Sequence, residues 1–112
     1  MTRAWAWAVI ALAGLSLPVA APADTVTTQS LVADMTRRPV PLKAQDGKAI
    51  TAEQVFVDLR RRDGMPVKAD RLNSYARFAE RSACGSRQVL ASVIIGTSEG
   101  AGRFEVLCAG AE

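Results

Sequence analysis

Residues 51–63, TAEQVFVDLRRRD, decide the predicted fold because they form the clearest helical pattern in the chain. Thr51 stands where a helix cap belongs, and Gln54 follows at the capping-box spacing. The apolar side chains share one helical face: Ala52, Val55, Phe56 and Leu59. Gly64 and Pro66 then provide a stop. We therefore predict a first helix here, with Val57 off its apolar face.

A second helix is predicted from Asp70 to Ala83, with Asp70 as its cap. Its apolar face consists of four residues: Leu72, Tyr75, Ala76 and Ala79. The connection from Gly64 to Ala69 is short, so the two helices are expected to pack as neighbours.

Two strands are predicted after the helices. In an extended conformation, residues 88–95 would present apolar side chains on both faces, which favours a buried or central strand. Residues 96–102, rich in glycine, are predicted to form a flexible loop. Residues 103–108 alternate between apolar and charged side chains, as in a half-exposed antiparallel strand. The predicted fold class is α+β, with two helices packed on a small antiparallel sheet.

The segment before residue 51 contains a hairpin signal. Asp46-Gly47 supplies the positive φ angles of a tight turn, so residues 40–51 are predicted to form a small hairpin. Pro41 then requires an edge position. Residues 24–39 are left open between a strand at Thr25–Thr28 and a short helix beginning near Ser30. The predicted globular domain spans residues 40–112.

The chain begins with the pattern of a cleavable signal peptide over residues 1–23. Arg3 precedes an apolar run to Leu17, and the small residues of Ala21-Pro22-Ala23 fit a cleavage site. A retained membrane anchor is the competing interpretation, but the run is shorter than the roughly 20 residues that span a bilayer. We expect a periplasmic or secreted protein with no transmembrane anchor in its mature form.

Composition narrows the functional classes. The sequence contains no histidine, which excludes His-dependent triads and removes the commonest transition-metal ligand. Loss of Arg3 with the signal lowers the net charge from +3 to +2, too little to indicate nucleic-acid binding. No catalytic residue, metal site or cofactor is predicted.

Cys84 and Cys108 are the only cysteines, and their spacing is unlike a redox C-x-x-C motif. An exported protein permits oxidation, so we predict one structural disulfide between them.

Four arginines are candidate contacts for an anion or a protein partner: Arg60, Arg61, Arg77 and Arg81. Arg60 and Arg61 belong to an Arg-Arg-Arg run, which is also typical of solvated charges in the last turn of a helix. Arg77 and Arg81 are four residues apart on the polar face of the second predicted helix. A further candidate contact is the loop at Thr97, Ser98 and Glu99, since long hairpin loops often carry binding function.

The function predicted from these observations is an exported, non-catalytic interaction module. Its partner is expected to be another envelope protein or an anionic envelope component. Two alternatives stay open: a small carboxylate-dependent enzyme, and an envelope-associated structural protein that contacts anionic surfaces through arginine. The acidic residues of the predicted domain and its flank are scattered in the sequence, with no spacing that indicates a catalytic pair.

Signal-peptide cleavage leads to a direct prediction. Protein isolated from the envelope or the medium should begin at or near Asp24 and should lack Trp5 and Trp7. Mass spectrometry measures the first property and tyrosine-like fluorescence reports the second. An intact mass that includes Met1 would contradict the prediction.

Overall fold

The computed structural model describes residues 23–110, so the predicted signal peptide, apart from Ala23, lies outside the described part of the chain. Five strands and one helical segment follow one another there: β2 (Ala23–Thr27), β3 (Leu31–Lys43), β4 (Ala49–Arg61), the 3₁₀ turn η1 (Ala69–Arg71), α1 (Leu72–Cys84), β5 (Val89–Ser98) and β6 (Ala101–Ala109).

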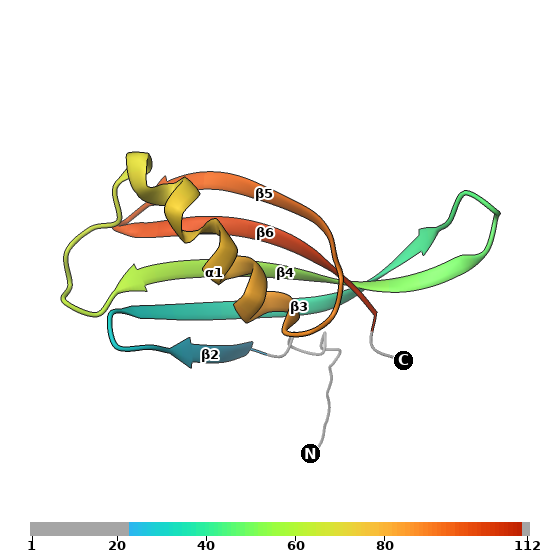
Figure 1. Cartoon of the computed structure of the whole chain (residues 1–112), viewed down its shortest axis with the longest axis horizontal. Coiled ribbons are helices and arrows are strands. Elements are labelled where there is room, and N and C mark those ends of the chain that lie inside the picture. Colours follow the sequence, from blue (N-terminus) through green and yellow to red (C-terminus); the bar gives the residue numbers. More distant parts are fainter. Residues whose placement is uncertain (1–22, 111–112) are drawn as a thin grey trace, which may run out of the picture.

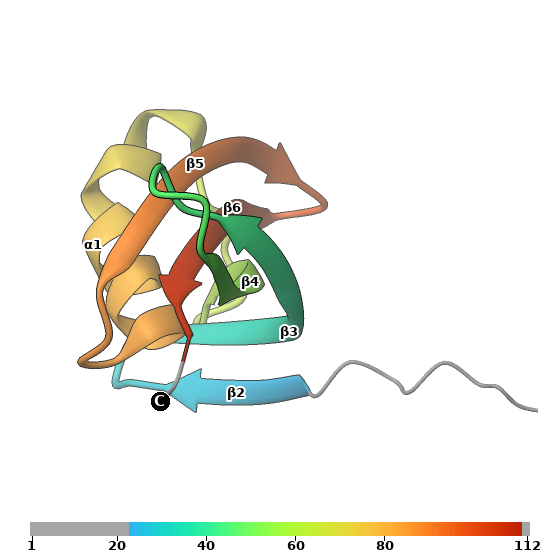
Figure 2. The ribbon, with the colours of Figure 1, turned by 90° about the vertical axis from the view of Figure 1, so that its right-hand side faces the viewer.

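The five strands form one antiparallel sheet in the order β2-β3-β4-β6-β5. Helix α1 connects β4 to β5, and β6 lies between those two strands in the sheet (Figure 1). Figure 2 shows α1 on one side of the curved sheet. The fold is therefore mostly β, with one helical segment covering a single face.

The predicted helix over residues 51–63 is wrong, because these residues form most of strand β4. Val55, Val57 and Leu59 are fully buried at every second position, which is the period of a strand. Phe56 is 39% exposed on the other face. The helical interpretation had placed Phe56 in the core and Val57 outside it, and both assignments are reversed. Because this segment is a strand, the prediction of an α+β fold with two helices on a small sheet is wrong.

The hairpin prediction around Asp46-Gly47 is confirmed, although the hairpin is longer than expected. Gly47 has φ of 85°, and β3 pairs with β4 from Leu31 opposite Arg61 to Lys43 opposite Ala49. Residues 24–39, left open in the sequence, are extended in β2 and β3. Strand β2 pairs with β3 only as far as Thr36, so Pro39 and Pro41 lie where β3 is an edge, as proline requires.

The helix predicted from Asp70 to Ala83 is confirmed as α1, with a 3₁₀ turn before it. Asp70 is not its cap, because neither η1 nor α1 has a side-chain cap hydrogen bond. Helix α1 buries Leu72, Ala79 and Ala83 against the sheet. The core that results consists mainly of these residues of the strands: Ala33, Met35, Val55, Val57, Leu59, Phe104 and Val106.

The last two strands correct two predictions. Strand β5, expected to be buried or central, is the outermost strand beside β6. The flexible loop expected over residues 96–102 is a two-residue turn, because β5 extends to Ser98 and β6 begins at Ala101. Glu99 and Gly100 have φ of 53° and 83°, which matches the positive angles that tight hairpin turns need.

The predicted disulfide is confirmed. Cys84 is the last residue of α1, and Cys108 lies in β6 opposite Val89 at the start of β5. Their Cα atoms are 5.4 Å apart, and both residues are buried. The bridge therefore ties the end of the helix to the sheet beside the first residue of β5.

Removing the bridge should lower stability strongly. The double variant Cys84→Ser/Cys108→Ser is expected to lose about 3 kcal/mol in free energy of unfolding, because the unfolded chain regains the freedom of a loop spanning 24 residues in sequence. Thermal denaturation of the wild type with and without reductant measures the effect. The double variant is the control, since its melting temperature should not respond to reductant. Equal melting temperatures for the reduced and oxidised wild type would contradict the prediction.

Candidate functional site

Strand β5 presents an open edge along the described chain. It pairs with β6 on one side only, so the backbone N–H and C=O groups that point outward from its other side have no strand partner within residues 23–110. Such a row of groups is a template for another extended segment. We call Val89–Ser98 the β5 edge.

The side chains of the β5 edge are unusually apolar for an outer strand. Five of the eight large hydrophobic side chains exposed within residues 23–110 lie on it: Val89, Leu90, Val93, Ile94 and Ile95. Val93 and Ile95 are each 54% exposed. No charged residue occurs between Arg87 and Glu99. Outer strands are normally protected by charged residues or proline, so this strand lacks the usual side-chain protection.

Two grooves border the β5 edge. A groove of about 490 Å³ lies beside the start of the strand and is lined by seven residues: Ala49, Ile50, Thr51, Gln88, Leu90, Ala109 and Gly110. A second groove, of about 270 Å³, is lined by another seven: Arg38, Val40, Gln54, Ala91, Val93, Glu105 and Leu107. Leu90 thus borders one groove, and Val93 borders the other, which crosses the sheet face opposite α1 from β3 to β5.

The pairing of β5 with β6 is irregular at two points. The register shifts between Val89 and Ala91 and again between Ile94 and Gly96, which leaves Leu90 and Ile95 as extra residues. Bulges of this kind bend a strand and increase its twist. Only Ala91–Ile94 therefore forms a regular stretch between them.

The sheet face opposite α1 carries a polar network beside the apolar side chains of Phe56, Val93 and Leu107. Arg38 donates to the Gln54 side chain at 2.7 Å, and Arg103 forms an ion pair with Asp58 at 3.5 Å. These contacts explain how this face stays in contact with water, apart from the exposed ring of Phe56. The β5 edge is therefore the more apolar of the two exposed regions of the sheet.

The four candidate arginines are not brought together. Arg60 and Arg61 are the last two residues of β4, and not part of the last turn of a helix. Because they are adjacent in a strand, their side chains point to opposite faces of the sheet. Arg60 donates to the backbone carbonyl of Glu99 at 3.1 Å. Arg77 and Arg81 are exposed on α1.

The candidate contact at Thr97, Ser98 and Glu99 also takes a different form from the expected loop. Thr97 and Ser98 are the last residues of β5, and only Glu99 lies in the turn. Because Thr97 and Ser98 continue the β5 edge, any partner contact there belongs to the strand and not to a mobile loop.

A second cluster, Arg37 with Glu53 and Arg87, was not found by sequence reasoning. Arg37 donates to Glu53 at 3.0 Å and to the carbonyl of Ala83 at 2.7 Å. Arg87 donates to the same Glu53 oxygen at 2.7 Å. The cluster satisfies carbonyls at the C-terminal end of α1, so its role is structural. No local sequence pattern indicates this cluster, because its two arginines and its glutamate are far apart in sequence.

The Arg37 guanidinium stays charged in this cluster. Burial lowers its pKa, but the hydrogen bond and charge of Asp24, together with those of Glu53, raise the pKa overall. Asp24 accepts from Arg37 at 3.1 Å. The cluster is therefore an ionic link between β2, β3, β4 and the helix.

Within residues 23–110 there is no cluster of three acidic or cysteine side chains able to hold a metal ion. The same residues contain no helix long and apolar enough to cross a membrane. Comparison with protein-family models, curated proteins and solved structures finds no match for this chain.

Replacing Arg37 should destabilise the fold, and replacing its neighbour should not. Arg37→Ala removes donors to Glu53 and to the end of α1, so we expect a loss of about 1–3 kcal/mol in free energy of unfolding. Arg38→Ala is the matched control: its side chain is exposed and contacts Gln54, and the expected loss is within about 0.5 kcal/mol. Urea titration followed by circular dichroism measures both. Equal losses for the two variants would contradict a special role for Arg37.

Proposed function

We propose that this chain is an exported, non-catalytic interaction module that binds an extended, uncharged apolar segment of another polypeptide. The segment adds as a sixth strand to the β5 edge. The observation that carries the proposal is the combination, on one outer strand, of an open backbone edge with five exposed large hydrophobic side chains.

Strand addition uses two kinds of contact at this edge. Backbone hydrogen bonds give affinity without reading sequence, and alternate side chains of the added segment read neighbouring cavities. Here the grooves beside Leu90 and Val93 are the available cavities. Strand β5 has no charged side chain to offer an ion pair, and Arg38 and Glu105 of the Val93 groove are already hydrogen-bonded to Gln54, so a charged segment would lose hydration at the edge with little compensation. This favours an apolar partner segment.

The bulges favour a separate segment over a second copy of this chain. If two β5 strands paired with each other, the ladder would have to accommodate the irregularities at Leu90 and Ile95 twice, once from each copy. Bulges at sheet edges are one of the devices by which proteins suppress pairing between identical edges. A flexible partner segment has no such constraint, because it adopts its register on binding.

Export and the absence of catalysis are part of the same proposal. The signal-peptide pattern and the Cys84–Cys108 disulfide are both typical of proteins in oxidising compartments, the periplasm or the cell exterior. A carboxylate-dependent enzyme needs two acidic groups in one cleft. Of the two grooves at the β5 edge, one contains Glu105 and the other contains no acidic residue, and a further groove, where the β2–β3 turn meets the end of β4, contains Asp63 alone. A binding role is therefore better supported than an enzymatic one.

The proposal is tested with a phage-displayed library of random ten-residue peptides, selected on the immobilised mature chain. Enriched peptides should be apolar and uncharged, and when bound they should slow hydrogen exchange of β5 amides. The variant Val93→Lys/Ile95→Lys should bind them at least about tenfold more weakly, because it places two charges on the apolar edge. Affinities are measured by fluorescence polarisation of the labelled peptides.

The matched control is Asn73→Lys/Ser74→Lys, which adds the same two charges at exposed positions of α1. Its peptide affinity should stay within about twofold of wild type. Peptides that bind the β5 variant as well as the wild type would overturn the proposal. So would a concentration-dependent dimer, seen by analytical ultracentrifugation, that Val93→Lys/Ile95→Lys abolishes, because the occupant would then be a second copy.

A further inference from the structure

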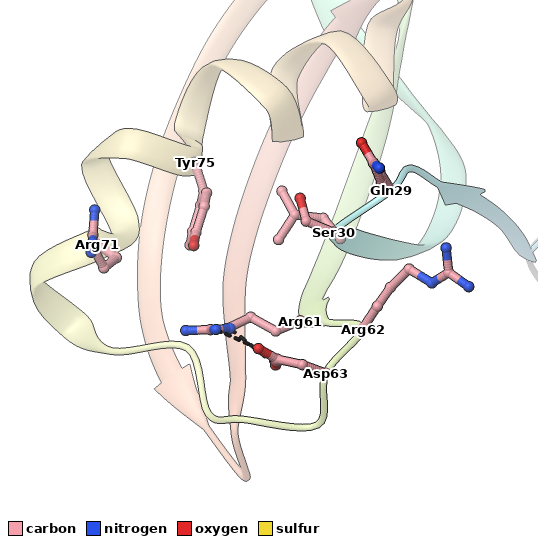
Figure 3. Close-up of a pocket in the computed structure, with 8 residues that line it drawn as sticks. Gln29, Ser30, Arg61, Arg62, Asp63, Arg71 and Tyr75 are labelled. Carbon is pink, nitrogen blue, oxygen red and sulfur yellow. Dashed lines mark hydrogen bonds and ion pairs between the residues drawn. The ribbon is translucent and has the colours of Figure 1, made fainter.

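A third groove, of about 390 Å³, lies away from the β5 edge, where the β2–β3 turn meets the end of β4 and the start of α1. Its lining is rich in arginine and polar groups: Gln29, Ser30, Leu31, Arg61, Arg62, Asp63, Arg71 and Tyr75. We call it the arginine groove (Figure 3). Of these residues only Arg61 was predicted as a contact, and the lining comes from residues 29–31, residues 61–63 and two positions of the helical segment.

The charges of the arginine groove do not balance. Three arginines and one aspartate line it, which leaves a net charge of +2. Arg61 is paired with Asp63 through both Nε and Nη2. Arg62 donates to the backbone carbonyl of Thr28 at 3.1 Å, a neutral acceptor. Arg71 has no carboxylate partner within residues 23–110. Two guanidinium charges are therefore left without a counter-charge from the described chain.

The side chains bordering the groove offer several donors from different directions. In Figure 3 the ring of Tyr75 points toward the Arg61 guanidinium, with Arg71 on one side and Ser30 on the other. Arg62 turns away toward the other side of the groove. The Tyr75 hydroxyl makes no hydrogen bond to another residue in the range 23–110. Tyr75 and Arg61 therefore face each other in the groove, and Arg71 borders it as an exposed side chain that can turn toward an anion bound between them.

The contact with Asp63 shows that Arg61 is oriented to donate two hydrogen bonds to one anionic group. Its two carboxylate oxygens take hydrogen bonds from two nitrogens of one guanidinium, the fork arrangement by which arginine also binds phosphate. The hydrogen bond from Arg61 and that from the Met65 backbone hold the pKa of Asp63 below its ordinary value. Asp63 therefore stays ionised at neutral pH and competes with any anion for Arg61.

We propose that the arginine groove binds a phosphate monoester, held by Arg61 and Arg71 with a hydrogen bond from Tyr75. A phosphate monoester carries a charge of about −1.5 to −2 at neutral pH, opposite in sign to the net charge of the lining, and it has three strong acceptor oxygens for the three donors. The phosphoryl group is that of a soluble phosphate ester or of a lipid headgroup, two sources with the same chemistry.

The test uses the mature chain and three probes: inorganic phosphate, glycerol 3-phosphate, and phosphatidylcholine vesicles containing phosphatidic acid. Binding is measured by chemical-shift titration for the soluble probes and by vesicle sedimentation for the lipid. Arg71→Gln should weaken binding about fivefold or more, since one of two direct cationic donors is lost. Tyr75→Phe should weaken it by a smaller factor. Asp63→Asn should tighten it several-fold, because the competitor of Arg61 becomes neutral while its side-chain oxygen still accepts from the Met65 N–H.

The control is Arg77→Gln/Arg81→Gln, which removes two exposed positive charges of α1 outside the groove and should leave affinity within about twofold. Groove-dependent binding of glycerol 3-phosphate identifies a soluble ester, and groove-dependent binding of vesicles alone identifies a lipid headgroup. Three results would overturn the proposal: no binding of any probe, equal losses in Arg71→Gln and in the α1 control, or weaker binding by Asp63→Asn. Circular dichroism of each variant shows that the fold is retained.

Discussion

One constraint governs this structure: a single helix of thirteen residues has to supply the apolar cover for a five-stranded sheet. Helix α1 packs on the middle of one face, where Val55 and Val57 of β4 and Phe104 of β6 are fully buried or nearly so. The cover does not extend to the whole sheet. The opposite face compensates with ion pairs and hydrogen bonds, and the strand farthest out beyond β6 is left with its hydrophobic side chains in water.

The two proposed binding regions separate two kinds of recognition. The β5 edge has backbone groups and apolar side chains but no charge, whereas the arginine groove has excess positive charge and few apolar atoms to offer. They share no residue, and they lie on different elements. The two proposals are therefore compatible with each other, because binding at one of these regions does not occupy the other.

Much of the local structure was predictable, and the errors have a common physical origin. The turn at Gly47, helix α1 and the disulfide are specified by neighbouring residues or by having one possible pairing. Residues 51–63 fit both periods, since Val55 and Leu59 are apolar in a helix and in a strand alike. Tertiary pairing with β3 and β6 decided between them, and Val57 was the one residue that favoured the strand.

The position of β5 and the composition of the arginine groove were harder to predict for a different reason. An apolar run such as residues 89–95 normally indicates burial, and nothing within the run shows whether other strands lie on both sides of it. Arg71 and Tyr75 line the same groove as Arg61 because the helical segment lies across the sheet near the end of β4. Such groupings depend on topology, which a single sequence encodes weakly.

The uncharged run from Gln88 to Ser98 also affects the tendency of the free chain to aggregate. A window of β-branched and apolar residues without charge or proline is the composition from which cross-β aggregates form. In this fold the run stays in water even after folding is complete, with its two bulges as the built-in safeguard. We therefore expect the same strand to limit the concentration at which the free chain remains soluble.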